Sequence, residues 1–195
     1  MASSPHLIAG RLALDFANTT PGRDLSWDEF VAFLVDSGLI TNDRAARLRP
    51  LLATEPQAID ALLLRILRLR ESLRAIFASV VTGKRVPRAW IEPVNDILRI
   101  TEGHDELVLH EDSWRLQYVA RESGLEWLLA AIARSAAELI VEGSAAPIRR
   151  CANTSCQLFF YDDSRTHRRR WCSMSVCGNR HKVASFQRRH ARRSA

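Results

Sequence analysis

The sequence has no long apolar run and no recognisable secretory leader. No stretch approaches the roughly 20 apolar residues needed to span a bilayer. The N-terminus, MASSPHLIAG, lacks a basic segment that leads into an apolar one, so it does not resemble a secretory signal. We therefore expect a cytoplasmic protein with no membrane partner, in a compartment where disulfides are rare.

Signatures of catalysis and of repetitive architecture are also missing. We find no internal repeat, no low-complexity segment, no glycine-rich phosphate loop and no catalytic motif that can be defended. The apolar fraction of 47% in 195 residues is enough for a hydrophobic core, which argues against a globally disordered chain. The expectation is a folded protein that is not an enzyme, with one ordinary domain plus a small appendage, or two small domains.

Acidic residues are scarce near the C-terminus, where basic residues are concentrated. The 48 residues from 148 to 195 contain 12 of the 28 Lys and Arg but two of the 22 Asp and Glu, a net charge of +10. Residues 1–147 carry a net charge of −4, and all four cysteines lie in the basic part. We predict a body, residues 1–147, and a C-terminal module, residues 148–195. The asymmetry points to nucleic acid, or to an anionic membrane surface, as partner.

The body is predicted to be mainly α-helical, with one β-hairpin. Ser26 and Glu29 form a capping-box pattern at a helix start, while Gly83 and Gly143 follow helical patterns as stop signals. Thr54 is a second start signal, with Pro56 in the first turn. The predicted helices cover residues 27–36, 43–49, 54–82, 88–100 and 124–143, and the predicted hairpin covers 105–120.

The segment LALDFANT near the N-terminus combines apolar and polar residues in an unusual way. Leu12, Leu14 and Phe16 predict a short strand or a buried extended segment. Asp15 lies among these apolar neighbours, and Arg70 projects from the apolar face of the long helix. One hypothesis is a buried Asp15–Arg70 ion pair. A second is an effector pocket formed by Asp15, Asn18 and Arg70. We favour a third, that these are capping or boundary residues without a ligand role.

Four cysteines occur as two pairs with equal spacing, Cys151-x4-Cys156 and Cys172-x4-Cys177, with 15 residues between them. Two such pairs joined by a short loop suit one tetrahedral zinc ion held by four thiolates. A disulfide needs an oxidising compartment, and a reactive thiol does not explain four paired cysteines. Replacement of one ligand by His167 or His181 stays open. A closed site of this kind predicts structural zinc, because the module is small and has little core.

The chain around these cysteines predicts a treble-clef-like arrangement. Residues 158–161 would form the first arm of a short hairpin, Asp162 and Asp163 its turn, and the basic run 165–170 its return arm. A helix would then begin near the second cysteine pair. Gly178 is expected to permit a tight turn, Asn179 to cap the helix, and Arg180 to pack structurally over Trp171.

The C-terminal helix is predicted to have two unlike faces. Val183 and Phe186 share an apolar or neutral face that we expect to pack on the module, and the other face is almost wholly cationic. Cationic clusters of this kind suit phosphates, and arginine also reads guanine. A solubilising tail and a membrane-surface helix are weaker alternatives. The predicted nucleic-acid contacts are Arg165, Arg168, Arg169, Arg170, Lys182, Arg188, Arg189, Arg192 and Arg193.

The run Cys177-Gly178-Asn179-Arg180, with its spaced cysteines, resembles the CGNR zinc finger. LDFANT and the helical body are similar to the ABATE domain, which usually precedes that finger. The resemblance implies a bacterial, stress-responsive transcription regulator. It also implies zinc on Cys151, Cys156, Cys172 and Cys177, and double-stranded DNA bound by the finger.

The sequence as a whole predicts a mainly α protein of the α+β class, with a helical body and a C-terminal four-cysteine zinc finger. We expect a DNA-binding transcriptional regulator associated with the nucleoid. Its body would respond to a small-molecule effector or form a homodimer. An RNA-binding or ribosome-associated protein, a protein-interaction adaptor and an enzyme hidden in the body remain as alternatives.

Overall fold

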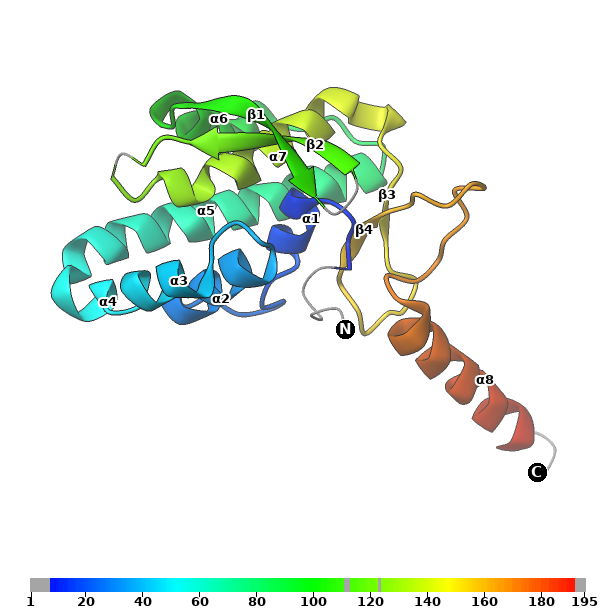
Figure 1. Cartoon of the computed structure of the whole chain (residues 1–195). Helices are drawn as coiled ribbons and strands as arrows, with labels where there is room; N and C mark the ends of the chain where they lie inside the picture. The colour runs from blue at the N-terminus through cyan, green and yellow to red at the C-terminus, as the bar shows by residue number, and fades with distance from the viewer. Residues whose placement is uncertain (1–7, 111–112, 123, 192–195) are drawn as a thin grey trace.

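The computed structural model describes residues 8–110, 113–122 and 124–191. As predicted, the chain is mainly α-helical with small antiparallel sheets. The helical body makes up most of the molecule, and the last helix projects away from it (Figure 1). Within the described ranges, no helix combines the length and apolar character that crossing a membrane requires.

The elements follow one another with short connections. In chain order they are α1 (Leu12–Ala17), α2 (Trp27–Asp36), α3 (Asn42–Leu48), α4 (Leu51–Thr54), α5 (Pro56–Val81), α6 (Arg88–Ile100), β1 (Gly103–His110), β2 (Ser113–Ala120), α7 (Trp127–Glu142), a 3-10 turn η1 (Gly143–Ala145), β3 (Ile148–Arg150), β4 (Phe159–Tyr161), a π turn η2 (Met174–Gly178) and α8 (Asn179–Ala191).

Local capping signals place most helix boundaries where the sequence predicts them. The Ser26 hydroxyl accepts a hydrogen bond from the Glu29 backbone N–H, and the Glu29 carboxylate accepts one from the Ser26 N–H, so the capping box at α2 is formed. Thr54 is an exception. It closes the short helix α4, which was not predicted, and its hydroxyl donates to the Pro50 carbonyl. The long helix α5 therefore begins at Pro56, a residue suited to a first helical position.

Helix α5 runs through the body and carries the centre of its core. Its predicted apolar face is buried, with Ile59, Ile66, Leu73 and Phe77 at 0% exposure. Each such side chain stabilises the fold by about 1.5–3 kcal/mol. The helix ends before Gly83, whose φ of +66° is accessible to glycine with little strain.

The prediction of a strand or extended segment near the N-terminus is wrong, because residues 12–17 form the helix α1. This helix packs against α5, α7 and β4, so it is surrounded on several sides. Residues 13–17 are all buried, which removes the amphipathic period that distinguishes a helix from a strand. Ser135 of α7 accepts a hydrogen bond from the Ala13 N–H at 3.2 Å and so satisfies one free amide at the helix start.

The predicted hairpin is confirmed as the antiparallel pair of β1 and β2. Its register places Leu107 opposite Leu116 and Leu109 opposite Trp114. The hairpin is anchored near its base, where the Arg134 guanidinium of α7 forms an ion pair with Asp105 at 2.7 Å and lies over the Tyr118 ring.

The second sheet corrects the hairpin predicted between the two cysteine pairs. Strand β4 pairs with β3, which precedes Cys151, and not with the basic run 165–170. The basic run is a loop, and its Arg170 carbonyl accepts a hydrogen bond from the Ala152 N–H at 2.8 Å. The backbone of β4 thus pairs with β3, at the start of the module, and the basic run does not supply a strand.

Body and C-terminal module meet in one continuous buried core. Phe160 is fully buried, and the Phe159 ring lies 6.2 Å from the Phe77 ring of α5. The Asn18 amide donates to the Phe159 carbonyl at 2.7 Å and accepts from the Phe159 N–H at 2.9 Å. The Tyr161 N–H donates to the Ala9 carbonyl at 2.7 Å. Asn18 and Phe159, which are 141 residues apart in the sequence, therefore belong to one packed unit.

We call the two hydrogen bonds between Asn18 and Phe159 the Asn18–Phe159 clamp. Its removal tests whether the body and the C-terminal module are packed as one unit. Asn18→Ala removes both bonds and leaves a buried N–H and a buried C=O without partners. We expect the free energy of unfolding, measured by urea denaturation, to fall by about 2–4 kcal/mol. Asn42→Ala, at an exposed position on α3, should change it by no more than about 0.5 kcal/mol. Equal losses in the two variants would show that the clamp does not contribute.

Candidate metal centre and nucleic-acid interface

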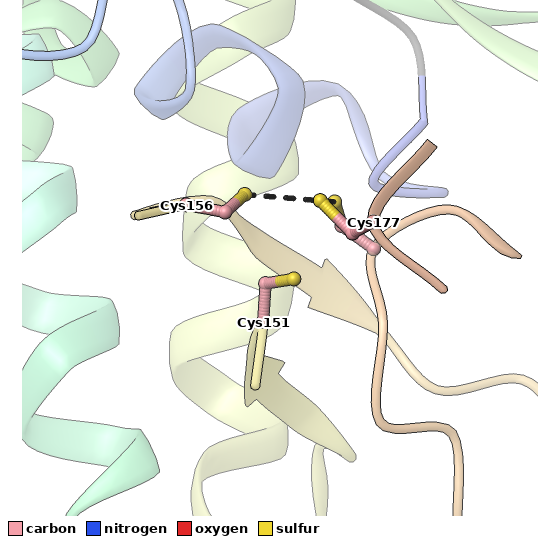
Figure 2. A group of neighbouring side chains, drawn as sticks. Cys151, Cys156 and Cys177 are labelled. Atoms are coloured by element: carbon pink, nitrogen blue, oxygen red, sulfur yellow. Dashed lines mark hydrogen bonds between the residues drawn. The ribbon is translucent and has the colours of Figure 1, made fainter. Parts of the chain in front are cut away.

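The four cysteines come from segments on both sides of β4. Cys151 directly follows β3, and Cys156 closes a turn in which its N–H donates to the Asn153 carbonyl at 2.8 Å. Cys172 precedes η2, and Cys177 lies within it. Figure 2 shows the sulfur atoms of Cys151, Cys156 and Cys177 pointing toward a common centre.

The spacing of the sulfur atoms fits a four-thiolate metal site. All four lie within 4.8 Å of one another, with 3.7 Å between Cys156 and Cys172 and 3.8 Å between Cys172 and Cys177. Zinc–sulfur bonds of about 2.3 Å in a tetrahedron place neighbouring sulfurs about 3.8 Å apart. A disulfide would require about 2.05 Å, and all four thiols are free. The donor set and its spacing therefore fit one zinc ion.

Charge explains why this cluster needs a cation. Burial raises the pKa of Cys156 to about 11, and it raises the pKa of Cys172 as well, with repulsion from neighbouring thiolates adding to the effect. Burial also opposes ionisation of Cys151, but N–H groups of Cys172 and Asn153 outweigh it and lower that pKa. The Asn153 side-chain amide donates to the Cys177 sulfur at 3.6 Å. A dication supplies the remaining stabilisation of four thiolates.

The helix after the metal site starts differently from the prediction. Ser173, not Asn179, is the cap: its hydroxyl accepts from the Val176 N–H, and Asn179 donates to the Ser175 carbonyl. Gly178 does not have the positive φ that a glycine-specific turn requires. A Cβ there would lie 2.7 Å from the sulfur of Met174, an exposed and flexible side chain that can move aside.

The two histidines proposed as alternative ligands lie in other contacts. His167 contacts the Asp162 carbonyl through Nδ1 at 2.7 Å. The His181 ring lies against Trp171, tilted by 35° with 4.8 Å between the ring centroids. The guanidinium over Trp171 is that of Arg170 and not, as predicted, that of Arg180. Among the described residues, the grouping able to hold a metal consists of the four cysteines.

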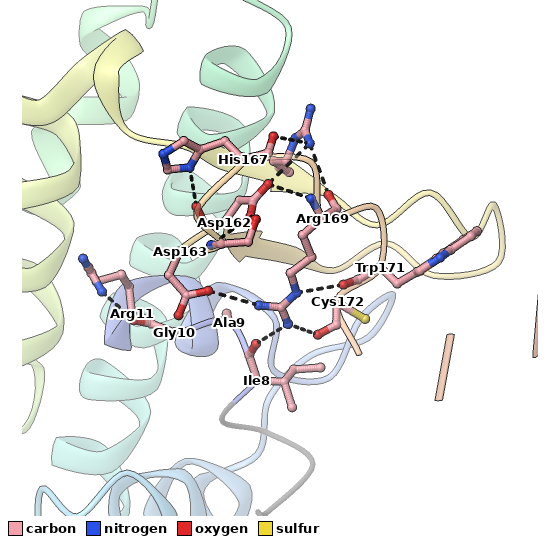
Figure 3. A network of polar contacts seen from close by, with 12 residues as sticks. Ile8, Ala9, Gly10, Arg11, Asp162, Asp163, His167, Arg169, Trp171 and Cys172 are labelled. Atoms are coloured by element: carbon pink, nitrogen blue, oxygen red, sulfur yellow. Dashed lines mark hydrogen bonds and ion pairs between the residues drawn. The ribbon is translucent and has the colours of Figure 1, made fainter. Parts of the chain in front are cut away.

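A hydrogen-bonded hub around Asp162 shapes the basic loop (Figure 3). Asp162 is fully buried, and its carboxylate accepts from the Ser164 hydroxyl at 2.5 Å and the Arg169 N–H at 2.9 Å. Burial opposes ionisation of Asp162, but these bonds and the Arg149 charge lower its pKa. Arg149 also donates to the His167 carbonyl at 2.9 Å. Arg149 was not among the predicted site residues, although two acids within a basic module are a signal for internal pairing.

Arg169, one of the predicted nucleic-acid contacts, is engaged inside the module. Its guanidinium donates to the Trp171 carbonyl at 3.0 Å and to the Cys172 carbonyl, and it lies 4.7 Å from the Phe160 ring centre. It also reaches the Ile8 carbonyl and forms an ion pair with Asp163 at 3.8 Å. Arg169 therefore connects the metal-binding segment to the N-terminal segment of the body.

The other predicted contacts differ in position. Arg165, Arg168, Arg170 and Lys182 are exposed. Arg188 and Arg189 continue along α8, although their side chains lie outside the described part, and Arg192 and Arg193 lie outside the described residues altogether. The prediction that the apolar face of α8 packs on the module is wrong, because Val183 and Phe186 are each 56% exposed. Helix α8 projects away from the body (Figure 1).

The three predicted effector residues do not converge on one cavity. Asp15 accepts a hydrogen bond from the Ala9 N–H at 2.9 Å, and Arg70 donates to the Arg23 carbonyl at 2.7 Å and to Thr20. None of the ion pairs among described residues joins Asp15 to Arg70, so the hypothesis of that pair is wrong. Asn18 lines a hollow of about 490 Å³ beside the loop that Arg70 braces. A second hollow, of about 550 Å³, lies beside the metal site and is bordered by Arg180.

Comparison with known families agrees with this geometry. The model described as "CGNR zinc finger" matches residues 148–190. The ABATE model, described as "Putative stress-induced transcription regulator", matches residues 10–143. The resemblance inferred from the cysteine spacing and from LDFANT is thereby confirmed, as is a site for one zinc ion on the four cysteines. No curated protein matches the chain.

Removal of one thiol tests the metal site. We expect Cys172→Ser to lower zinc affinity by more than about 100-fold and to loosen the start of α8. Loss of a group that only hydrogen-bonds a metal ligand weakens metal binding by about 10–100-fold, and loss of a ligand itself weakens it more. Zinc per chain, by elemental analysis, should fall from about one to near zero. Ser155→Ala, which changes an exposed side chain beside Cys156, should retain zinc. Full zinc content in Cys172→Ser would contradict the site.

The buried carboxyl of Asp15 makes stability depend on pH. Burial raises the pKa of Asp15 to about 6, and the N–H groups of Ala9 and Ile8 offset this only partly. The folded state therefore holds the proton more tightly than the unfolded state, and this contribution to stability is lost as pH rises through about 6. We expect the unfolding free energy of the wild type minus that of Asp15→Asn to fall by about 1 kcal/mol between pH 5 and pH 7. A difference that stays flat in urea denaturation over this window would contradict the assignment.

Proposed function

The chain belongs to the ABATE family of transcription regulators and carries a CGNR zinc finger, and from this premise we propose that it is a zinc-dependent, DNA-binding transcriptional regulator. The proposal places it in the cytoplasm, on the nucleoid. Its DNA-binding part is the C-terminal module, and its regulatory part is the helical body. The site assigned to zinc has four protein ligands and no open position, so the proposal gives the metal no catalytic role.

Zinc would serve the module by holding its segments together at one point. The metal supplies a cross-link and positive charge at the centre of the four thiolates. Side chains of the module add further connections. Ser173 caps the turn that contains Cys177, and Arg169 ties the carbonyls of Trp171 and Cys172 to the body. The start of α8 is thereby oriented relative to the body.

The observation that carries DNA binding is an uncompensated cationic surface on this oriented module. The acids of the module, Asp162 and Asp163, pair internally with Arg149 and Arg169. From residue 164 to the end of the chain no acidic residue occurs, while Arg165, Arg168 and Lys182 are exposed. A projecting helix with this charge suits the major groove and its flanking phosphates.

The body is suited to regulation because it shares the core of the module. The Asn18–Phe159 clamp joins the loop after α1 to β4, and Asn18 also lines the hollow of about 490 Å³. We assign to this hollow the small-molecule effector, with Asn18 as a contact and Arg70 as the brace of its wall. An effector bound there would alter the strength of the clamp and thus the position of the finger.

Salt dependence of duplex DNA affinity tests the proposal. We expect log affinity to fall linearly with log salt, with a slope of about −0.9 for each phosphate contact. Arg168→Ala and Lys182→Ala should each weaken binding and reduce the slope by about 1 if each contacts one phosphate. Arg85→Ala removes an exposed arginine from the body and should leave the slope unchanged.

Two outcomes would contradict the proposal. Affinity that does not respond to salt would exclude phosphate contacts, and equal losses in the Arg85 and Arg168 variants would remove the assigned surface. Preference for RNA over DNA of matched length and sequence would support the RNA-binding alternative instead.

A further inference from the structure

The β1–β2 hairpin carries an apolar face that the body does not cover. Leu107, Leu109, Trp114 and Leu116 are between 61% and 67% exposed. The register places Leu107 opposite Leu116 and Leu109 opposite Trp114, so the four side chains lie on one face as two cross-strand pairs. We call this surface the hairpin face.

The opposite face of the hairpin is more polar. His104, Glu106 and Gln117 are exposed there, and its two valines, Val108 and Val119, are half-buried. In a hairpin that packs on its own protein, the apolar residues normally lie toward the core and the polar ones toward water. Here the end of the face near Asp105 and Tyr118 is held to α7 through Arg134, and the apolar pairs continue beyond this anchor into solvent. An isolated two-stranded hairpin is marginal in water, so its exposed face gains stability from a further surface.

The size of the hairpin face suits association of two copies. Since a tryptophan offers up to about 250 Å² and a leucine somewhat less, the four side chains expose on the order of 500 Å². Two copies would together bury about 1,000 Å², the lower end of a specific interface. A contiguous apolar patch of this size is near the upper end of what monomeric proteins expose, and such patches are often functional.

We propose that the protein forms a two-fold symmetric dimer in which two hairpin faces stack on each other. A face of apolar cross-strand pairs can contact the same face of a second copy, as an isologous interface requires. The Asp105–Arg134 ion pair lies at the margin of the hairpin face and contains one charge of each sign. Two-fold pairing therefore does not bring only like charges together. The hairpin lies on the side of the body away from α8, so the dimer leaves both C-terminal helices accessible (Figure 1).

Two adjacent residues on opposite faces provide a matched test by sedimentation velocity. Leu116→Glu places a charge in the hairpin face, whereas Gln117→Glu places the same side chain on the polar face. For the zinc-loaded wild type and for Gln117→Glu we expect a dimer of twice 22.1 kDa, with a dissociation constant in the micromolar range. For Leu116→Glu we expect a monomer, a weakening of at least about 100-fold, because a charge at the centre of an apolar interface is desolvated without a partner. Trp114→Ala, with circular dichroism and thermal unfolding recorded on each variant, separates loss of the interface from loss of the fold.

Three outcomes would overturn the proposal: a wild-type monomer at about 100 µM, a dimer that persists in Leu116→Glu and Trp114→Ala, or equal weakening in Gln117→Glu. The measurement contains no DNA, so its failure is independent of the proposed function. If the proposed function holds as well, folded Leu116→Glu should still bind DNA, but with a smaller salt slope, because one finger contacts fewer phosphates than two.

Discussion

Electrostatics among four sulfur atoms is the constraint on which the C-terminal module depends. They lie within 4.8 Å of one another, and burial opposes their ionisation. A zinc ion turns this repulsion into a cross-link between the segment after β3 and the segment that leads into α8. Helix α8 exposes Val183 and Phe186, so its direction derives from the metal site and the η2 turn and not from an apolar core of its own.

The module and the body are separate as sequence families but joined as a packed structure. One family match ends at residue 143 and the other begins at residue 148. Phe159 and Phe160 nevertheless lie in the same core as α1 and α5, and Asn18 satisfies the backbone of Phe159. A buried polar clamp of this kind is costly to break, so the orientation of the finger and the structure of the loop after α1 are energetically coupled.

Arginines in and beside the basic loop have two roles, which depend on the acceptors that each side chain reaches. Arg149 and Arg169 direct their donors at backbone carbonyls and at the buried Asp162, because a loop without strand partners leaves such acceptors unsatisfied. Arg165 and Arg168 remain exposed and keep their charge at the surface. The two acids of the module thus offset the charges of Arg149 and Arg169, which leaves Arg165 and Arg168 unpaired with either acid.

Features that depend on short spacing follow from the sequence alone: the capping box at Ser26, the stop at Gly83, the cysteine pairs with their zinc site, and the charge asymmetry at residue 148. Tertiary structure alone decided α1, the pairing of β4 with β3, the internal role of Arg169 and the exposed hairpin face. These features depend on partners far along the chain, such as Asn18 and Phe159, which lie 141 residues apart. Local propensity and periodicity carry no information on contacts of that range. A helix that is buried on all sides, such as α1, lacks the amphipathic period that would predict it. The sequence also does not distinguish an arginine that binds a phosphate from one that donates to a backbone carbonyl.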